Sequence, residues 1–428
     1  MHFGFINDVS TKAGKLVVGL DIGTTKVCAV VAEVTCGSPD ENTFFSNGCE
    51  MNILGIGASS SAGIKKGVVT NIESTVESIR AAVREAEASS GVEIRAVHAG
   101  ITGSHVSSFS SNGIIAVKGS EIGQTEIDNV LEAAKAVAIP FDREILHVIP
   151  VGYTVDGQGD ITDPCGMAGV RLETDVQILT GTATSVKNLI RSCEKAGLEV
   201  IETVFQPLAS AEAVLTQDEK NLGAAIIDIG GGTTDVALFH DGNICHSSVL
   251  ALGGNNFTND AAIGLRIPTS EAEAIKKRHG CSMISLIGDD DQIEIGSDHK
   301  TGRVIPRSYL VEILQPRAEE LFALIKDEIV RSGYHKYLNS GVVLTGGASL
   351  MEGIDVMAEH MLELPVRVGY PTGPKGISHT TCDPSYATGI GLVLFGARET
   401  IAEHDVYQSR MFSGVAARMK GLVGGLFK

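Results

Sequence analysis

The sequence predicts an α/β fold made of two related lobes with mixed β-sheets. Short apolar runs rich in β-branched residues alternate with amphipathic segments along the whole chain, as in proteins whose strands and helices interleave. One strand–turn–strand motif also occurs twice. Asp-Ile-Gly begins at Asp21 and again at Asp228, 207 positions later, and a Thr-Thr pair follows each time. The repeat predicts two copies of one structural unit that face a single ligand.

Composition sets the outer limits of this prediction. A length of 428 residues suggests two to three domains, and 43% hydrophobic with 20% charged residues is ordinary for a soluble globular chain. No apolar run reaches the ~18–20 residues needed to cross a bilayer, and Met1–Lys15 lacks the apolar core of a signal peptide. The eight cysteines form no Cys-x-x-Cys, which predicts neither a disulfide framework nor a zinc site and favours a reduced cytoplasm. A net charge of −18 argues against nucleic-acid binding.

In the first half, the residue pattern predicts the first hairpin at 16–34, strands at 53–57 and 64–69, and a helix at 72–88 with apolar residues at helical spacing. Residues 92–170 form a separate unit, with strand-like runs at 94–101, 106–109, 114–117 and 145–150 and a helix at 126–137. A strand at 176–180 and a helix at 184–196 follow, and Gly197 is a suitable C-cap for that helix.

In the second half, a helix at 206–216 with Pro207 in its first turn precedes the second hairpin. A helix at 270–279 is expected to begin with Ser270 and Glu273 as a capping box and to end at Gly280. Residues 281–308 predict short strands and turns, and 312–330 a helix that is kinked at Pro316 or begins there. A buried strand at 342–345 enters a glycine turn, and small residues at 384–398 predict a closely packed helix between the two halves.

The two hairpin turns have the composition of a phosphate site. Glycines leave the turn backbone open, so successive N–H groups can point at phosphate oxygens. The aspartate at each strand end places a carboxylate where a nucleotide-bound Mg²⁺ would sit. One or two protein carboxylates are enough for Mg²⁺, because it keeps most of its waters. The later Gly346-Gly347-Ala348 turn could let the backbone approach a flat base or a sugar.

Two phosphate loops followed by an adenosine loop, in this order, resemble the superfamily of actin, sugar kinases and DnaK-type chaperones. Within it the chain is most similar, over nearly its full length, to the bacterial cell-division family FtsA. Four segments carry this resemblance: Leu146–Pro150 with Asp163–Arg171, the helix Glu271–Cys281, the Gly-Arg…Pro-Arg…Gln-Pro-Arg pattern of 302–320, and a short basic C-terminus. The resemblance implies an actin-like fold of duplicated ribonuclease-H-like domains with an inserted subdomain called 1C and a C-terminal amphipathic helix.

The resemblance also implies roles for individual residues in binding ATP and Mg²⁺. Asp21 and Asp228 would hold Mg²⁺ through water, with Asp235 as a secondary candidate, and Gln206 would orient a water for slow hydrolysis. The phosphate cradle would be Gly23, Thr24, Thr25 and Lys26 with Gly230, Gly231, Gly232, Thr233 and Thr234. Ribose and adenine contacts would come from Gly253, Gly254, Glu273, Lys276, Gly346, Gly347 and Ala348.

The implied function is an ATP-binding protein that polymerises on the cytoplasmic face of the cell membrane at midcell, tethers FtsZ filaments and recruits later division proteins. Its partners would be further copies of the chain, with 92–170 as one contact surface, anionic lipids, and the C-terminal tail of FtsZ, received near Arg303, Arg307 and Arg317. The implied boundaries are 1–91, 171–205 and 371–398 for subdomain 1A, 92–170 for 1C, 206–263 and 318–370 for 2A, 264–317 for 2B, 399–409 for a linker and 410–428 for a membrane helix.

The composition of the C-terminal tail predicts membrane binding independently of the family resemblance. From Tyr407 onward the chain has no acidic residue and four basic ones, so residues 1–409 carry −22. At 100° per residue, the large apolar residues of the last 17 positions fall within an arc of ~140°. The residues expected at the membrane are Phe412, Val415, Arg418, Met419, Lys420, Leu422, Val423, Leu426 and Phe427. A basic amphipathic segment of this kind favours a helix that lies in the membrane interface.

Two other functions fit the same motifs. A sugar-kinase-type phosphotransferase would share the phosphate loops, but the sequence shows no motif for a second substrate and no obvious catalytic base. A PilM-like pilus-assembly adaptor would share the fold, but it would have no reason to carry the basic C-terminal amphipath.

Overall fold

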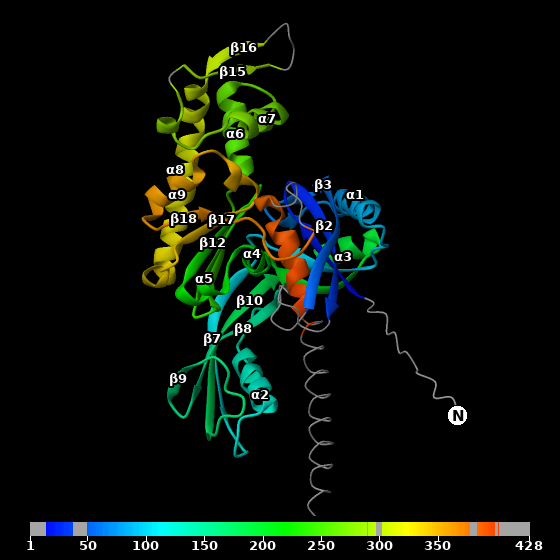
Figure 1. The fold of residues 1–428 in the computed structure, drawn as a ribbon, viewed down its shortest axis with the longest axis vertical. Coiled ribbons are helices and arrows are strands. Elements are labelled where there is room, and N and C mark those ends of the chain that lie inside the picture. Colours follow the sequence, from blue (N-terminus) through cyan, green and yellow to red (C-terminus); the bar gives the residue numbers. More distant parts are fainter. Residues whose placement is uncertain are drawn as a thin grey trace, which may run out of the picture.

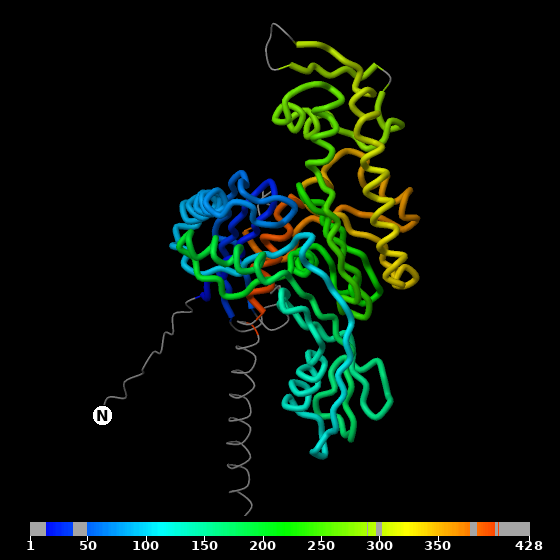
Figure 2. The backbone as a smooth tube through the Cα atoms, turned by 180° about the vertical axis from the view of Figure 1, so that it is seen from behind, coloured from blue at the N-terminus to red at the C-terminus, as the bar shows by residue number. Residues whose placement is uncertain are grey.

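The computed structural model describes residues 14–36, 49–288, 290–296, 302–376, 383–398 and 401. These residues form two lobes that lie side by side, an inserted unit below them, and helices between the lobes (Figure 1). The view from behind shows the same three bodies (Figure 2). The C-terminal residues expected at the membrane lie outside the described residues. No helix in the described part of the chain combines the length and the hydropathy that a membrane span requires.

The first lobe is built on a five-stranded sheet in the order β11-β6-β1-β2-β3. Its strands are β1 (Lys15–Ile22), β2 (Lys26–Cys36), β3 (Cys49–Ser60), β6 (Ala96–Ile101) and β11 (Glu199–Phe205). The first three are antiparallel, and β6 and β11 continue in parallel with β1. Helices α1 (Ile72–Ser90) and α3 (Ala183–Ala196) pack on one face, and the two-stranded β4 (Ile64–Lys65) and β5 (Val68–Val69) lies before α1. Gly197 caps α3 in the left-handed conformation, as expected.

The second lobe repeats this sheet strand for strand, in the order β14-β13-β12-β17-β18. Its strands are β12 (Ala224–Ile229), β13 (Thr234–His240), β14 (Asn243–Leu250), β17 (Val342–Thr345) and β18 (Val366–Val368). Again the first three are antiparallel, and the last two continue in parallel with β12. The predicted duplication of the hairpin is therefore a duplication of the whole sheet.

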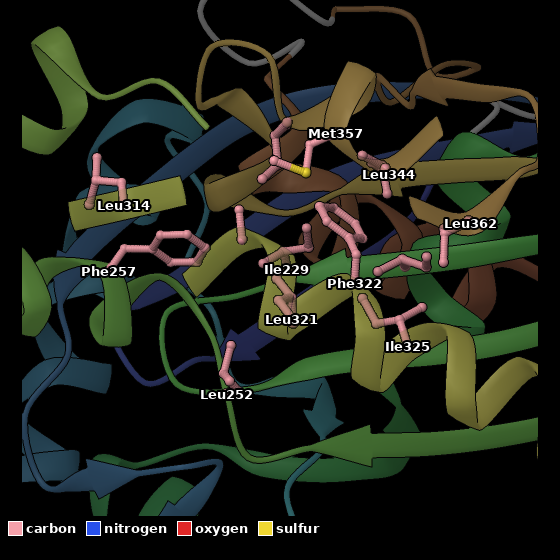
Figure 3. Packing of buried hydrophobic residues seen from close by; sticks show 14 of the residues in the cluster. Ile229, Leu252, Phe257, Leu314, Leu321, Phe322, Ile325, Leu344, Met357 and Leu362 are labelled. Carbon is pink, nitrogen blue, oxygen red and sulfur yellow. The ribbon is translucent and has the colours of Figure 1, made fainter. Parts of the chain in front are cut away.

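One face of the second sheet is covered by a helical layer that continues upward into a small subdomain. The elements are α6 (Gly254–Leu265), α7 (Thr269–His279), the hairpin β15 (Gln292–Ile295) and β16 (Arg303–Pro306), α8 (Arg307–Ser332) and α9 (Ile354–Leu362). Figure 3 shows Phe322, Ile325 and Leu321 of α8 packed against Ile229 of β12 and Leu344 of β17. Phe257 of α6 and Leu314 of α8, at the left of Figure 3, belong to the same core.

The opposite faces of the two sheets share one core. Alternate strand residues such as Val30 in the first sheet and Ile226 in the second lie in a single buried cluster. Between them run α4 (Gln206–Val214) and the helix at 387–398, which appears orange-red between the lobes in Figure 1. A Cβ on Gly391 of this helix would lie 1.8 Å from the carbonyl oxygen of Ala209 in α4. The predicted small-residue helix between the halves is thus present and in backbone contact with α4. The short α5 (Gln217–Leu222) follows α4.

The inserted unit is a four-stranded antiparallel sheet in the order β7-β10-β8-β9 with one helix. It contains β7 (Ser107–Ala116), α2 (Gln124–Lys135), β8 (Arg143–Val155), β9 (Gln158–Ile161) and β10 (Arg171–Thr182), and is called the insert below. The boundaries of the insert in the sequence differ from the expected range of 92–170. Strand β6 pairs in the first-lobe sheet, and strand β10 pairs in the sheet of the insert.

The insert touches both lobes. Gln177 of β10 donates to the carbonyl of Cys245 in β14 of the second lobe at 2.9 Å, and Ser108 of β7 donates to the carbonyl of Ser247 at 2.9 Å. On the other side, strand β8 approaches β11 of the first lobe. The insert therefore bridges the two lobes at their base, although all its own strands lie in one sheet.

Three local expectations are corrected. Helix α7 begins at Thr269 after Pro268 rather than at a Ser270 cap, and Glu273 bonds to Thr258 and Lys276 instead of closing a capping box. Helix α8 runs through Pro316 from Arg307, because residues on both sides of the proline are buried in the second-lobe core.

The third correction concerns the cysteines. Cys36 and Cys49 lie opposite each other in the β2–β3 pairing, with their Cα atoms 4.1 Å apart, and form a disulfide. Spacing alone could not indicate this pair, since strand register decides which residues face each other.

Candidate functional site

The two predicted turns close in the same way. The N–H of Gly23 donates to the carbonyl of Lys26, and the N–H of Gly230 donates to the carbonyl of Thr233, both at 2.9 Å. Each turn follows the central strand of its sheet, β1 or β12, so both turns emerge at corresponding points of the two lobes. Equivalent sequence has produced equivalent geometry.

The turns meet across the space between the lobes. A Cβ on Gly231 would lie 2.3 Å from the Thr25 side chain, and one on Gly232 would lie 2.7 Å from that of Thr24. Any larger residue would therefore push the turns apart. The glycines are required here by this close approach between lobes.

A cavity of about 610 Å³ lies between the lobes next to these turns. Its lining includes most of the predicted site: Asp21, Gly23, Thr24, Thr25, Lys26, Gln206, Asp228, Gly230, Gly231, Thr233, Asp235, Gly254, Glu273, Lys276, Gly346, Gly347 and Ala348. Three predicted residues do not line it. Gly232 packs on Thr24, the hydroxyl of Thr234 donates to the carbonyl of Leu252, and Gly253 lies against the second turn.

Three buried carboxyl groups surround the base of this cavity. Burial raises the pKa of Asp21 to about 7, with Asp228 adding to the rise and Lys26 opposing it. Burial also raises the pKa of Asp228, against hydrogen bonds from Ser210 and Thr388. Burial, reinforced by Asp228, raises the pKa of Asp235 well above its usual range. Lys26 opposes these shifts at Asp21 and Asp228 but does not offset the burial, and a cation near the three groups would lower the cost of ionising them.

These residues fit an ion held through water better than one held directly. Among the described residues there is no group of three or more His, Cys, Asp or Glu side chains arranged to hold a metal. Mg²⁺ needs only one or two protein carboxylates, because it retains most of its water shell. Asp21 and Asp228, on the two lobes, can supply them.

Gln206 is placed by contacts with the first lobe. It is the first residue of α4 and only 6% exposed, and its amide donates to Oδ1 of Asp21 at 2.9 Å. Gly100 leaves room for it, since a Cβ there would lie 3.1 Å from the Gln206 side chain. The predicted water-orienting amide therefore lies beside a predicted Mg²⁺ carboxylate.

The predicted lysines of the cavity, Lys26 and Lys276, bind other groups of the protein. The ammonium of Lys26 donates to the carbonyl of Ser385 at 2.6 Å and lies 3.7 Å from the Tyr386 ring centre. Lys276 forms an ion pair with Glu273 at 2.7 Å and donates to the carbonyl of Gly254 at 3.0 Å. The contacts of Lys276 join α6 to α7 at one end of the cavity.

Several lining residues carried no motif in the sequence. Thr102, at the end of β6, donates to Oδ1 of Asp235 at 2.7 Å and so joins the lobes by a buried hydrogen bond. Thr388 reaches Asp228 from the helix between the lobes, and Asn255 and Ser385 lie in the cavity wall. A Thr-Gly pair directly after a buried strand was the only available signal for Thr102.

The three arginines expected to receive a partner differ in their surroundings. Arg307 forms ion pairs with Glu352 and Asp291, and Arg317 with Asp260 and Glu320, so both already have intramolecular partners. Arg303 on β16 donates to the carbonyl of Leu265 and forms no ion pair within the described part of the chain. Val304, the next residue of β16, is 62% exposed, and Ile263, two residues before Leu265, is 77% exposed.

Known proteins match the chain along nearly all of its length. The family described as "Cell division protein FtsA" matches residues 225–391, and the "SHS2 domain inserted in FTSA" matches 103–180, the range of the insert. "Cell division protein FtsA" of Pseudomonas aeruginosa is 43% identical over 91% of this chain and 91% of its own. The proteins of the same description from Escherichia coli (36%, covering 97% and 98%) and Bacillus subtilis (38%, covering 90% and 84%) also match.

Solved structures with the same fold share far less sequence. A "PilM-PilN type IV pilus biogenesis complex" aligns with a TM-score of 0.64 at 17% identity, over 89% of this chain and 98% of the other. "MreB5 of Spiroplasma citri bound to ADP" aligns with a TM-score of 0.52 at 14% identity, over 91% and 98%. At these identities the likeness establishes an actin-like fold and nothing further.

Proposed function

Because the chain belongs to the FtsA family of cell division proteins, we propose that it binds ATP with Mg²⁺ between its lobes and works as an actin-like polymer that attaches FtsZ filaments to the membrane. One observation supports the nucleotide site most directly. The two matching turns touch each other beside a cavity of about 610 Å³, and buried aspartates line that cavity. The MreB5 structure, with the same fold, is described as bound to ADP, which supports a nucleotide in the equivalent cavity.

In this proposal the turn amides bind the phosphates, and Asp21 and Asp228 orient the waters of Mg²⁺. The bound ion would supply positive charge against the phosphates. Gln206 would orient a water near the terminal phosphate, but its amide cannot accept a proton, so hydrolysis would be slow. Binding rather than turnover is the main expected activity.

Calorimetry with Mg·ATP tests the nucleotide site. Asp228→Ala removes a carboxylate, and Gly232→Asp introduces a side chain where a Cβ alone would lie 2.7 Å from Thr24. Both variants should weaken binding at least tenfold. Asp327→Ala, at an exposed position of α8, is the matched control and should leave it unchanged. Unchanged affinity in both site variants would refute the assignment.

We propose that the insert provides one contact surface of the polymer. It contributes no strand to either lobe sheet, and it carries exposed apolar residues such as Ile114 (55%) and Val170 (73%). Replacing both with Glu should remove polymers from electron micrographs while ATP binding persists. Polymers of normal length in this double variant would place the contact elsewhere.

For the FtsZ tail we propose the surface around Arg303. The resemblance implies a short, partly acidic peptide, and Arg303 has no acidic partner among the described residues, whereas Arg307 and Arg317 do. Arg303→Glu should weaken peptide binding in fluorescence anisotropy. Arg303→Lys, which keeps the charge, is the control, and equal binding by the Glu variant would exclude this surface.

Membrane attachment is proposed for the last 17 residues on their sequence. Seven large apolar side chains, partly buried at roughly 1 kcal/mol each, would contribute about 7 kcal/mol. Four basic groups near anionic lipid add about 1 kcal/mol apiece. Ordering the four glycines of 414–425 offsets several of these, so a single chain would bind weakly, and polymers presenting many tails would bind far more tightly.

Sedimentation with anionic liposomes tests this attachment. Leu422→Glu combined with Phe427→Glu should release the protein while its unfolding temperature stays the same. A double variant that still sediments with liposomes would show that the tail is not the anchor.

A further inference from the structure

One side chain of the insert lies directly behind the predicted water-orienting residue. His147, on β8, accepts a hydrogen bond at its Nε2 from the backbone N–H of Phe205 at 3.0 Å. Phe205 is the N-cap of α4, and the next residue is Gln206, whose side chain binds Asp21. Phe205 thus contacts the insert through its backbone N–H, and the residue that follows it faces the cavity.

The start of α4 follows directly on β11, whose last residue, Phe205, pairs with Ile101 of β6. The helix end itself has no side-chain cap. Its N-cap is Phe205, whose side chain forms no capping hydrogen bond, and Pro207 has no N–H to donate. Phe205 is fully buried among Leu179 of the insert, Leu208 of α4 and Val249 of the second lobe. In this apolar setting an unpaired backbone N–H is costly, which makes the His147 acceptor important for the position of the helix end.

The acceptor itself is kept neutral and fixed. Burial lowers the pKa of His147 to about 4, so its ring is neutral, and the donor N–H of Phe205 selects the tautomer in which Nε2 is the acceptor. Its ring meets the edge of Phe395 on the helix between the lobes, with the ring centres 6.1 Å apart. The ring is therefore held from one side by packing and from the other by the Phe205 N–H.

We propose that His147 is a positioning residue through which the insert sets the place of Gln206 in the nucleotide cavity. The insert is also bound to β14 of the second lobe, so a partner or neighbouring copy that shifts the insert would move the start of α4. Coupling of this kind is reciprocal: what binds the insert changes nucleotide affinity, and nucleotide changes that affinity by the same factor. The link to nucleotide rests on the proposed function above.

Nucleotide affinity in a small variant set tests this role. His147→Leu removes the acceptor, displaces Gln206 and with it the Asp21 carboxylate proposed for Mg²⁺, and should weaken Mg·ATP binding about fivefold, which corresponds to one hydrogen bond of ~1 kcal/mol. His147→Gln offers a side-chain oxygen and should restore most of the affinity. Phe395→Leu, the matched control, removes the ring contact but keeps the acceptor, and should change affinity less than twofold. In a Gln206→Ala background, His147→Leu should cause no further loss.

Three outcomes would overturn the proposal: unchanged affinity in His147→Leu, an equal loss in Phe395→Leu, or a full additional loss in the Gln206→Ala background. Hydrogen exchange gives a readout without nucleotide. His147→Leu should speed amide exchange at Phe205 and Gln206, and Phe395→Leu should not. If the wild type fails to bind Mg·ATP, the proposed function falls, and unchanged exchange in His147→Leu would separately overturn the positioning role.

Discussion

Replacing Gly391 with alanine should have two opposite effects on stability, a gain from helix propensity and a larger loss from a clash with α4. In an exposed helix this change stabilises by up to ~1 kcal/mol. Here the new Cβ would lie 1.8 Å from the carbonyl oxygen of Ala209, so α4 and the helix at 387–398 would have to separate by about 1.5 Å to reach an ordinary carbon–oxygen contact. Overpacking costs typically ~1–3 kcal/mol, and a clash with the backbone of Ala209, which cannot move aside as a side chain can, favours the upper end. The expected net loss is about 2 kcal/mol.

Thermal and denaturant unfolding measure this loss. For domains of 150–250 residues, a loss of about 2 kcal/mol corresponds to a fall in Tm of roughly 4–8 °C. Gly389→Ala, two residues earlier on the same helix, is the matched control, because its Cβ would meet side-chain atoms and no backbone, namely a Val30 methyl at 3.0 Å and Sγ of Cys28 at 3.6 Å. That variant should be close to neutral. A Tm for Gly391→Ala at or above that of Gly389→Ala would refute the packing argument.

Three further predictions follow from the contacts around the cavity and the first sheet. Lowering the pH from about 6.5 to about 4 should reduce the free energy of unfolding by up to about 3 kcal/mol through His147. In this range the histidine is protonated in the unfolded chain, whereas its lowered pKa of about 4 keeps it neutral in the folded protein. In a pH series of urea unfolding curves, His147→Gln should flatten this part of the profile, and an unchanged slope would contradict the assignment. Thr102→Val leaves a buried oxygen of Asp235 without its donor and should cost about 1–3 kcal/mol in denaturant unfolding, whereas Thr102→Ser should cost much less. Alkylation of the oxidised, denatured protein followed by mass spectrometry should leave Cys36 and Cys49 unmodified, and labelling of either would disprove their disulfide.

Much of the fold could be predicted because its signals are local. The repeated Asp-Ile-Gly hairpin, the spacing of apolar residues in α1 and the glycine after α3 each depend on a few neighbouring residues. Helix ends were less predictable. Pro316 suggested a helix boundary, but the core residues around it keep α8 continuous, because burial of a whole helix face outweighs one lost hydrogen bond.

The candidate site divides in the same way. Glycine and aspartate at the two turns could be found because each motif is contiguous and occurs twice. Thr102, Thr388 and His147 could not, because each acts on a residue more than 50 positions away in the chain. Their side chains are ordinary for strands or helices. Only the packing of the lobes and the insert brings Thr102 and Thr388 to the cavity and His147 to the residue before Gln206.

The sequence by itself determined that two equivalent strand–turn–strand units exist, since strand period, glycine turns and aspartate positions are set within a dozen residues. Only the tertiary structure decided that the turns touch, that three carboxyl groups share one buried space, and that the insert reaches α4 through His147. The physical reason is distance along the chain. Local backbone preferences act over a few residues, whereas contacts, burial and pKa depend on which distant segments the hydrophobic core brings together.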